Sequence, residues 1–194
     1  MEQQLPSLKV CVFITGTNGV GKSTLVRALA ERYGGVRKVE NKVSYLANEK
    51  ICLAGVYKGK SWGGVDRING TSNLAGIVEE GLKHADIILC EGSMMDTFGL
   101  NLTNALFKAQ KQLVVSLYAD MLTIYNRLTA RSNGKYNNGK RNWKGIKKKQ
   151  DNAMNSARKF QQIGIPVLQI NTAKHNVTEI VDMFISELNK IKTI

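Results

Sequence analysis

A chain of 194 residues with 43% hydrophobic and 22% charged residues has the size and composition of one globular domain, which excludes the disordered and fibrous classes. No apolar run reaches the roughly 18 residues that a membrane-spanning helix requires, and residues 1–8 lack the basic and apolar regions of a secretory signal. We therefore expect a single domain over residues 1–194, located in the cytoplasm and without a membrane partner. The unusual feature of the composition is the net charge of +13.

Apolar segments typical of buried strands alternate with amphipathic segments along the chain. The predicted strands cover residues 9–15, 43–46, 51–57, 86–90, 112–118 and 166–170. The predicted helices cover residues 22–33, 71–84, 101–110, 120–130, 143–162 and 177–190. Two segments rich in Gly or Asn, 58–70 and 133–142, are predicted to be loops.

This alternation predicts an α/β fold of three layers, in which helices cover both faces of a mainly parallel, five-stranded sheet. Ligands of such sheets bind beyond the carboxyl ends of the strands. We expect Gly16, Glu91 and the segment after Tyr118 to meet there.

Cysteines and histidines give no sign of a metal site formed by side chains alone. Cys11, Cys52 and Cys90 lie in apolar segments without the paired spacing of a zinc site, which predicts buried, reduced thiols. His84 and His175 are isolated in the sequence, and we expect them in structural or surface positions.

A complete phosphate-binding motif, G-x-x-x-x-G-K-[ST], lies between the first predicted strand and the first predicted helix, as the motif requires. Its glycines let successive backbone N–H groups point into one concavity, and the helix adds its positive amino end. Lys22 would bind the β- and γ-phosphates, and Ser23 would bind Mg²⁺. The expected co-substrate is ATP with Mg²⁺, held by Gly16, Thr17, Asn18, Gly19, Val20, Gly21, Lys22, Ser23 and Thr24.

Two carboxylates are candidates for the groups that a kinase needs beside its triphosphate. Glu91 ends a predicted strand, where it would hold a Mg²⁺-bound water or act as the general base. Asp66 lies on a Gly-rich loop and is the rival candidate for the base, although turns favour Asp for structural reasons as well. On the same loop Arg67 is a candidate for binding a phosphate or the acceptor, and Trp62 is a candidate for stacking on a base.

Arg127 and Arg131 are four residues apart, so they project from one face of a predicted helix just before a loop. This pattern is typical of a lid, here residues 127–149, whose guanidinium groups stabilise the charge on a transferring phosphoryl group. An exposed helix end that is merely basic is the alternative.

Positive charge is concentrated between residues 127 and 159, which contain eleven basic residues and one acidic residue. Triphosphate binding needs only two or three cations, so this excess favours a polyanionic partner such as DNA. The candidate contacts to such a substrate are Lys135, Lys140, Arg141, Lys147, Lys148 and Lys149.

With these features the chain resembles the nucleotide-kinase branch of P-loop proteins. Within that branch it is similar to bacteriophage P-loop kinases that phosphorylate 5-hydroxymethyluracil in DNA, a step of thymine hypermodification. The resemblance is carried by the segments AGVY…WGGVD (residues 54–57 and 62–66), CEGS (90–93) and YNRLTAR (125–131). It implies a P-loop kinase fold, host cytoplasm as the location, and an acceptor side formed by Gly63, Gly64 and Asp66.

Three functions remain open at this point. The first is a kinase that phosphorylates a modified pyrimidine in DNA. The second is a small-molecule kinase for nucleosides or nucleoside monophosphates, with the same residues in the same roles. The third is a nucleotide-dependent switch or binding module that hydrolyses its nucleotide slowly.

Overall fold

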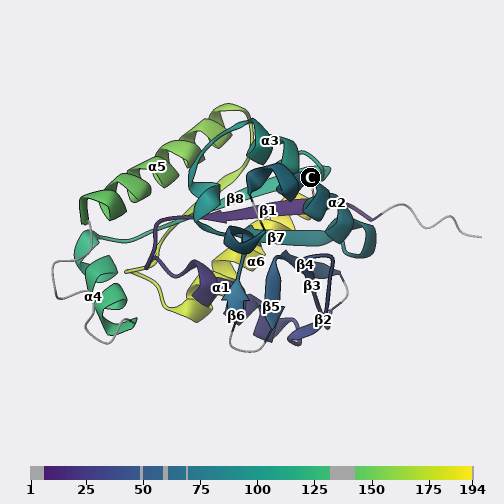
Figure 1. The fold of residues 1–194 in the computed structure, drawn as a ribbon, viewed down its shortest axis with the longest axis horizontal. Coiled ribbons are helices and arrows are strands. Elements are labelled where there is room, and N and C mark those ends of the chain that lie inside the picture. Colours follow the sequence, from purple (N-terminus) through teal and green to yellow (C-terminus); the bar gives the residue numbers. More distant parts are fainter. Residues whose placement is uncertain (1–6, 49, 59–60, 69, 132–142, 194) are drawn as a thin grey trace, which may run out of the picture.

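The structure is a computed structural model that describes residues 7–48, 50–58, 61–68, 70–131 and 143–193. Its centre is a seven-stranded sheet in the order β2-β3-β4-β7-β1-β8-β9 (Figure 1). Five adjacent strands run parallel to one another, and they are β4 (Ile51–Ala54), β7 (Ile87–Glu91), β1 (Val10–Thr15), β8 (Lys111–Tyr118) and β9 (Val167–Asn171). The fold is therefore the predicted α/β fold with a five-stranded parallel core, extended at one edge.

Two antiparallel strands form this extension, β2 (Val36–Glu40) and β3 (Val43–Leu46). The turn between them uses positive φ angles at Asn41 and Lys42. Strand β2 was not identified from the sequence, because its charged side chains are exposed at the sheet edge and it lacks an apolar run.

Helices cover both faces of the sheet, so the hydrophobic core consists of two layers. One layer is formed with α1 (Lys22–Arg32), α4 (Met121–Arg131) and α6 (Val177–Thr193). The other is formed with α2 (Leu74–His84), α3 (Leu100–Leu106) and α5 (Trp143–Gln162). Figure 1 shows α3 and α5 on the side of the sheet opposite to α1. Strands β1, β4 and β7 can be apolar runs because both of their faces are buried, whereas the edge strand β9 is only partly buried.

The segment from residue 51 to residue 73 differs most from the prediction. The strand expected over 51–57 is divided at Gly55, which has a φ of 122°, into β4 and β5 (Val56–Lys58). The loop expected over 58–70 instead contains β6 (Ser61–Gly63), which pairs with β5, and a 3₁₀ helix over Val65–Arg67. A second 3₁₀ helix, Thr71–Asn73, precedes α2. The prediction of a loop was wrong because this Gly-rich segment obtains its order from tertiary contacts rather than from local sequence: β5 packs against β2 and β3, and the 3₁₀ helix Val65–Arg67 packs against β7.

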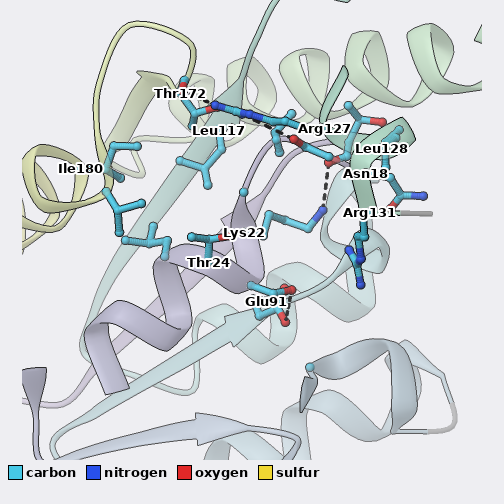
Figure 2. A pocket seen from close by; sticks show the side chains of 18 of the residues that line it. Asn18, Lys22, Thr24, Glu91, Leu117, Arg127, Leu128, Arg131, Thr172 and Ile180 are labelled. Carbon is cyan, nitrogen blue, oxygen red and sulfur yellow. Dashed lines mark hydrogen bonds between the residues drawn. The ribbon is translucent and has the colours of Figure 1, made fainter. Parts of the chain in front are cut away.

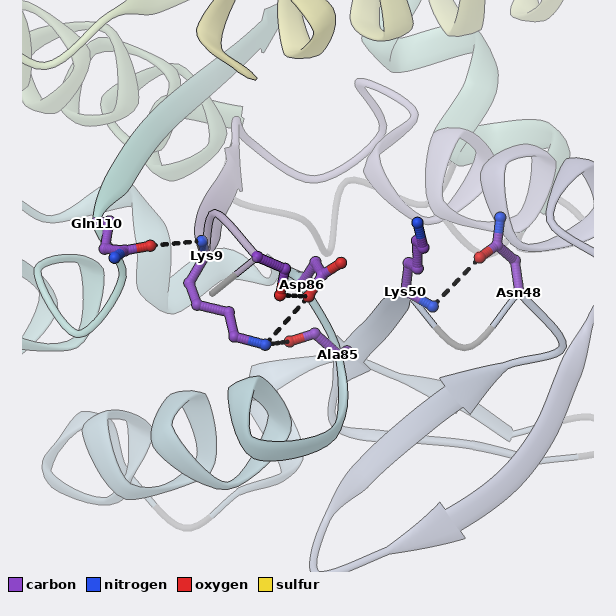
Figure 3. A network of polar contacts seen from close by, with 7 residues as sticks. Lys9, Asn48, Lys50, Ala85, Asp86 and Gln110 are labelled. Carbon is purple, nitrogen blue, oxygen red and sulfur yellow. Dashed lines mark hydrogen bonds and ion pairs between the residues drawn. The ribbon is translucent and has the colours of Figure 1, made fainter. Parts of the chain in front are cut away.

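Polar contacts join the amino ends of the central strands, which lie at the end of the sheet opposite to the phosphate-binding motif (Figure 3). The Lys9 ammonium donates to the carbonyl oxygen of Ala85 at 2.9 Å and to Asp86 Oδ1 at 3.1 Å. The Lys9 backbone N–H donates to Gln110 Oε1 at 2.9 Å. Such partly exposed ion pairs contribute about 0–1 kcal/mol each.

All three cysteines are buried free thiols, as predicted. Within the described ranges, none of the helices has the length and apolar character that crossing a membrane would demand.

Candidate nucleotide-binding and transfer site

The phosphate-binding motif joins β1 to α1 at the carboxyl edge of the sheet, and its backbone conformation requires glycine. Gly16, Gly19 and Gly21 have φ angles of 135°, 89° and 99°. A Cβ atom on Gly16 would lie 2.3 Å from the carbonyl oxygen of Leu117, and one on Gly19 would lie 3.0 Å from Leu128. The loop is thus wedged between β8 and α4, which holds it in the curled form that can surround a phosphate.

A cavity of ≈ 1030 Å³ opens over this loop. Of the predicted cofactor residues, Thr17 to Thr24 line the cavity and Gly16 does not. The structure brings together at the same cavity the predicted Gly64, Asp66, Glu91, Arg127 and Arg131. They come from the 3₁₀ helix Val65–Arg67 and the glycine before it, from the end of β7 and from α4, as expected where parallel strands end at one edge.

Lys22, the first residue of α1, is 8% exposed, and its ammonium lies inside the motif (Figure 2). It donates hydrogen bonds to the carbonyl oxygen of Gly16 and, at 3.2 Å, to that of Thr17. This position concentrates a positive charge under the curled backbone, where the phosphates of a nucleotide would bind.

Glu91 is the last residue of β7, and its carboxylate lies next to the Ser23 hydroxyl at the cavity. The Ser23 hydroxyl donates to Glu91 Oε1 at 3.4 Å, and the Glu91 side chain is almost fully buried. Burial raises the pKa of Glu91, while the charge of Lys22 partly opposes the increase. A hydroxyl and a carboxylate this close together are oxygen donors that Mg²⁺ accepts, so Ser23 and Glu91 fit the predicted ion, Glu91 directly or through water.

The β5–β6 hairpin packs directly on Glu91. A Cβ atom on Gly64 would lie 2.1 Å from the carbonyl oxygen of Glu91 and 2.8 Å from its Oε1. The buried Tyr57 hydroxyl donates to Oε1 at 3.5 Å, and burial, followed by the charge of Glu91, raises the Tyr57 pKa well above its usual value. Gly64 therefore provides the close approach that lets the hairpin fix the Glu91 carboxylate.

Asp66 lies beside the cavity, but its carboxylate is engaged by the turn that follows β7. It accepts hydrogen bonds from the Ser93 backbone N–H at 3.0 Å, the Ser93 hydroxyl at 3.1 Å and the Met94 N–H at 3.2 Å. Both carboxylate oxygens are thus occupied. These contacts favour the structural interpretation of Asp66, and the role of general base remains a prediction for this residue.

The two lid arginines have different surroundings. Arg127 donates to the Thr172 hydroxyl at 2.8 Å, to the Thr172 carbonyl oxygen at 2.6 Å and to the Gly19 carbonyl oxygen at 3.5 Å. Arg131, one turn further along α4, is exposed. Figure 2 shows Arg127 beside Thr172, far from Glu91 in the view, whereas Arg131 extends toward the Glu91 side. Both arginines line the cavity, and in this view Arg131 is the one directed toward Glu91.

Sequence reasoning missed a group of residues on the side of the cavity near Arg127. They follow β9 or begin α6, and they are Thr172, His175, Asn176, Val177 and Ile180. No motif marks them, but the rule that ligands bind beyond the carboxyl ends of parallel strands could have indicated the segment after residue 171. His175, expected to be a structural or surface residue, lies at the cavity.

A second missed residue is Asp96, in the 3₁₀ helix Ser93–Asp96 after β7. It is 4% exposed, and its Oδ1 accepts hydrogen bonds from the Gly16 N–H and the Thr15 hydroxyl, both at 2.8 Å. Nothing in the local sequence distinguishes this aspartate from a surface residue.

The basic segment lies next to the phosphate-binding motif. The Thr17 hydroxyl donates to the carbonyl oxygen of Ile146 in the first turn of α5, at 3.2 Å. Lys147, Lys148 and Lys149 follow directly and are exposed. The predicted Lys135, Lys140 and Arg141 lie outside the described residues, as do the side chains of Trp62 and Arg67. Gly63 is described only as part of β6, where it pairs with Val56.

Comparison with known proteins agrees with this architecture. The family model described as an AAA domain matches residues 12–152, which is more than half of the chain. No curated protein sequence matches the chain.

The solved structures that resemble this chain have low sequence identity to it. Deoxyadenosine kinase from M. mycoides with bound dCTP has a TM-score of 0.53 at 15% identity, covering 93% of this chain and 100% of that one. The YorR protein from Bacillus subtilis, in complex with phosphorylated GDP, has a TM-score of 0.58 at 16% identity, with 93% and 97% coverage. A sugar kinase from Janibacter sp. has a TM-score of 0.53 at 13% identity, with 93% and 95% coverage. The chain therefore belongs to the AAA-domain family of P-loop proteins, and it has the fold of P-loop kinases.

Proposed function

We propose that this protein is a Mg²⁺- and ATP-dependent kinase that transfers the γ-phosphoryl group to the hydroxyl of 5-hydroxymethyluracil in DNA. The observation that carries the proposal is the contact between Thr17 and the Ile146 carbonyl oxygen, which places the exposed lysines of α5 beside the phosphate-binding motif. A cationic surface that begins at the site of transfer suits an acceptor that is itself a polyanion.

The donor half of the reaction would use the motif as it stands. The backbone N–H groups of residues 17–23 surround the phosphates, and Lys22 moves from the loop carbonyls to the β- and γ-oxygens. Mg²⁺ bound by the Ser23 hydroxyl would neutralise charge that develops on the phosphates. Glu91 would hold this ion through a bound water, which leaves its carboxylate able to accept a proton. The nucleoside would extend toward Arg127, Thr172 and Val177, where the cavity continues.

On the acceptor half, Glu91 is the stronger of the two candidates for the general base. Its buried carboxylate has a raised pKa and so accepts a proton readily, whereas Asp66 is held by Ser93 and Met94. The hydroxyl gives its proton to Glu91, its oxygen bonds to the γ-phosphorus, and the bond from that phosphorus to the β,γ-bridging oxygen breaks. Arg131 would stabilise the charge on the transferring group.

The exposed side of α5 would bind the phosphates of the DNA backbone. The described part of this helix carries six basic residues and a single acidic one, Asp151. In duplex DNA the 5-hydroxymethyl group projects into the major groove, so a helix alongside the transfer site is suitably placed to bind the flanking phosphates.

A small-molecule kinase for nucleosides or nucleoside monophosphates is the second candidate. It is supported by the fold similarity, which extends over 93% of the chain to a protein named deoxyadenosine kinase. In this case the lysines of α5 would only be solvated surface residues, with no role in binding the acceptor.

The decisive experiment compares acceptors. The protein is incubated with γ-labelled ATP and Mg²⁺ beside thymidine monophosphate, plain duplex DNA, and the same duplex containing 5-hydroxymethyluracil. Label in the modified duplex alone supports the proposal. Label in the monophosphate supports the small-molecule kinase, and release of free phosphate without any labelled acceptor supports the switch.

A charge variant tests the DNA surface. Replacing Lys147, Lys148 and Lys149 with Gln should reduce the salt slope of DNA binding by about 2–3, because each lost phosphate contact removes roughly 0.9. The matched control changes Lys83, Lys190 and Lys192 to Gln, an equal loss of charge on α2 and the end of α6. If the salt slope of DNA binding is the same in both variants, the lysines of α5 do not contact DNA.

A further inference from the structure

Asp96 is a buried carboxylate that none of the steps above uses. It follows Glu91 by five residues, in the 3₁₀ helix after β7, and does not line the nucleotide cavity. Its surroundings are the last residue of β1 and the first residue of the phosphate-binding motif. A residue with these neighbours can act on the nucleotide only through the loop.

Oδ1 of Asp96 connects the strand to the loop. It accepts hydrogen bonds from both the Thr15 hydroxyl and the Gly16 N–H at 2.8 Å, while the Thr15 hydroxyl also lies 3.2 Å from the carbonyl oxygen of Met95. The chain leaves the sheet at this point, and Gly16 has no room for a Cβ atom beside Leu117. Asp96 thus fixes the Gly16 backbone from one side, and the end of β8 confines it from the other.

The other backbone group of Gly16 is held by the lysine of the motif. Lys22 donates to the Gly16 carbonyl oxygen, so the N–H of this glycine is bound by a carboxylate and its C=O by an ammonium. When Lys22 moves to a nucleotide, Asp96 is left as the charged group that holds Gly16. Burial raises the pKa of Asp96, and the nearby charge of Lys22 opposes this increase.

Packing alone does not explain an aspartate at this position. Its Oδ2 is buried without a hydrogen-bond partner among the described residues. A buried carboxylate with only one satisfied oxygen is costly, and an apolar side chain would fill the same space at a lower cost.

We propose that Asp96 is a positioning residue, which holds the Gly16 end of the phosphate-binding loop in its curled form so that triphosphate binds to a preformed site. The inference rests on the nucleotide-binding part of the proposed function and is independent of the acceptor. A preformed loop lowers the entropic cost of binding, so its loss should weaken nucleotide affinity more than it slows transfer at saturation.

The test measures binding of a non-hydrolysable ATP analogue with Mg²⁺ by calorimetry, with thermal unfolding of each variant to set a temperature at which it is folded. Asp96→Ala removes the acceptor for the Gly16 N–H and should raise Kd about tenfold or more. Asp96→Asn can keep an acceptor oxygen at Oδ1 and should bind within threefold of the wild type. In the transfer assay, Asp96→Ala should raise the KM for ATP by a similar factor and change kcat less than threefold.

Asp86→Asn is the matched control, because Asp86 binds the residues that lead into β1 at the opposite end of the strand, namely Lys9 (Figure 3) and Ser7. It should leave Kd unchanged. If Asp96→Ala does not fold, Thr15→Val replaces it. This change preserves shape, removes one donor to Oδ1, and should raise Kd several-fold.

Wild-type affinity in Asp96→Ala, or in Thr15→Val where that variant stands in, would overturn the inference while leaving the proposed function intact. An equal loss of affinity in Asp96→Asn and Asp96→Ala would also overturn it, since the hydrogen bond at Oδ1 would then be irrelevant. Absence of binding by the wild type would overturn the proposed function and this inference with it.

Discussion

Replacing Gly64 with Ala should disable phosphoryl transfer while leaving nucleotide binding largely intact. The new Cβ atom would lie 2.1 Å from the carbonyl oxygen of Glu91, about 1 Å closer than the roughly 3.3 Å of a close carbon–oxygen contact. Overpacking of this kind typically costs about 1–3 kcal/mol of folding free energy. Either the hairpin or Glu91 must shift by about 1 Å, and displacements of that size can reduce a rate roughly 100-fold.

The assay for Gly64→Ala is initial-rate phosphoryl transfer at saturating ATP, together with the Kd for the ATP analogue. We expect kcat to fall about 100-fold and Kd to change less than threefold, because the three atoms nearest to the new Cβ belong to Glu91 and Tyr57 rather than to the phosphate-binding loop. The matched control is Gly76→Ala on α2, where a Cβ atom meets nothing within 4 Å. This control should raise the free energy of unfolding by about 0.5–1 kcal/mol, because Ala is the better helix former, and should leave transfer unchanged. Wild-type kcat in Gly64→Ala would refute the role of the hairpin in placing Glu91.

Three more predictions follow from the contacts of the site. The transfer rate should fall as pH decreases through the raised pKa of Glu91, because a general base must be deprotonated. Glu91→Gln should remove this acidic limb of the pH–rate profile along with most of the activity. A Glu91→Gln profile identical to that of the wild type would contradict the assignment of Glu91 as the base. Arg127→Ala should raise the KM for ATP about tenfold, since it removes two hydrogen bonds to Thr172 beside the cavity, and an unchanged KM would assign Arg127 to stability alone. Asp120→Ala should lower Tm by roughly 2–4 °C, with unchanged kinetics, because it removes the helix cap formed by the hydrogen bonds of Thr123 to Asp120. These bonds lower the pKa of Asp120, so the difference in Tm between variant and wild type should shrink as pH falls through that pKa.

Elements with a strong local signal could be predicted from the sequence. Strands β1, β4 and β7 are apolar runs because both of their faces are covered, and α5 has the predicted bounds because its amphipathic pattern is long and uninterrupted. The motif at Gly16–Ser23 was placed correctly because its glycines and lysine serve one local task. Each of these features is determined mainly by residues adjacent in the chain.

Features that depend on contacts between distant segments were missed or assigned differently. Strand β6 forms by pairing with β5, whose Tyr57 contacts Glu91, and Asp66 is bound to Ser93, 27 residues away. Asp96 became visible as a site residue only when β1 and β7 were paired. Burial and partner choice at these positions are properties of the tertiary structure, so no local pattern could have reported them.

The most direct test is calorimetric titration of the wild type and Lys22→Ala with a non-hydrolysable ATP analogue, each with and without Mg²⁺. We predict association by the wild type that is strengthened by Mg²⁺ and lost in Lys22→Ala, because the buried ammonium supplies the positive charge inside the motif itself. Lack of association between the wild type and any nucleoside triphosphate, or unchanged affinity in Lys22→Ala, would contradict a nucleotide site at this loop.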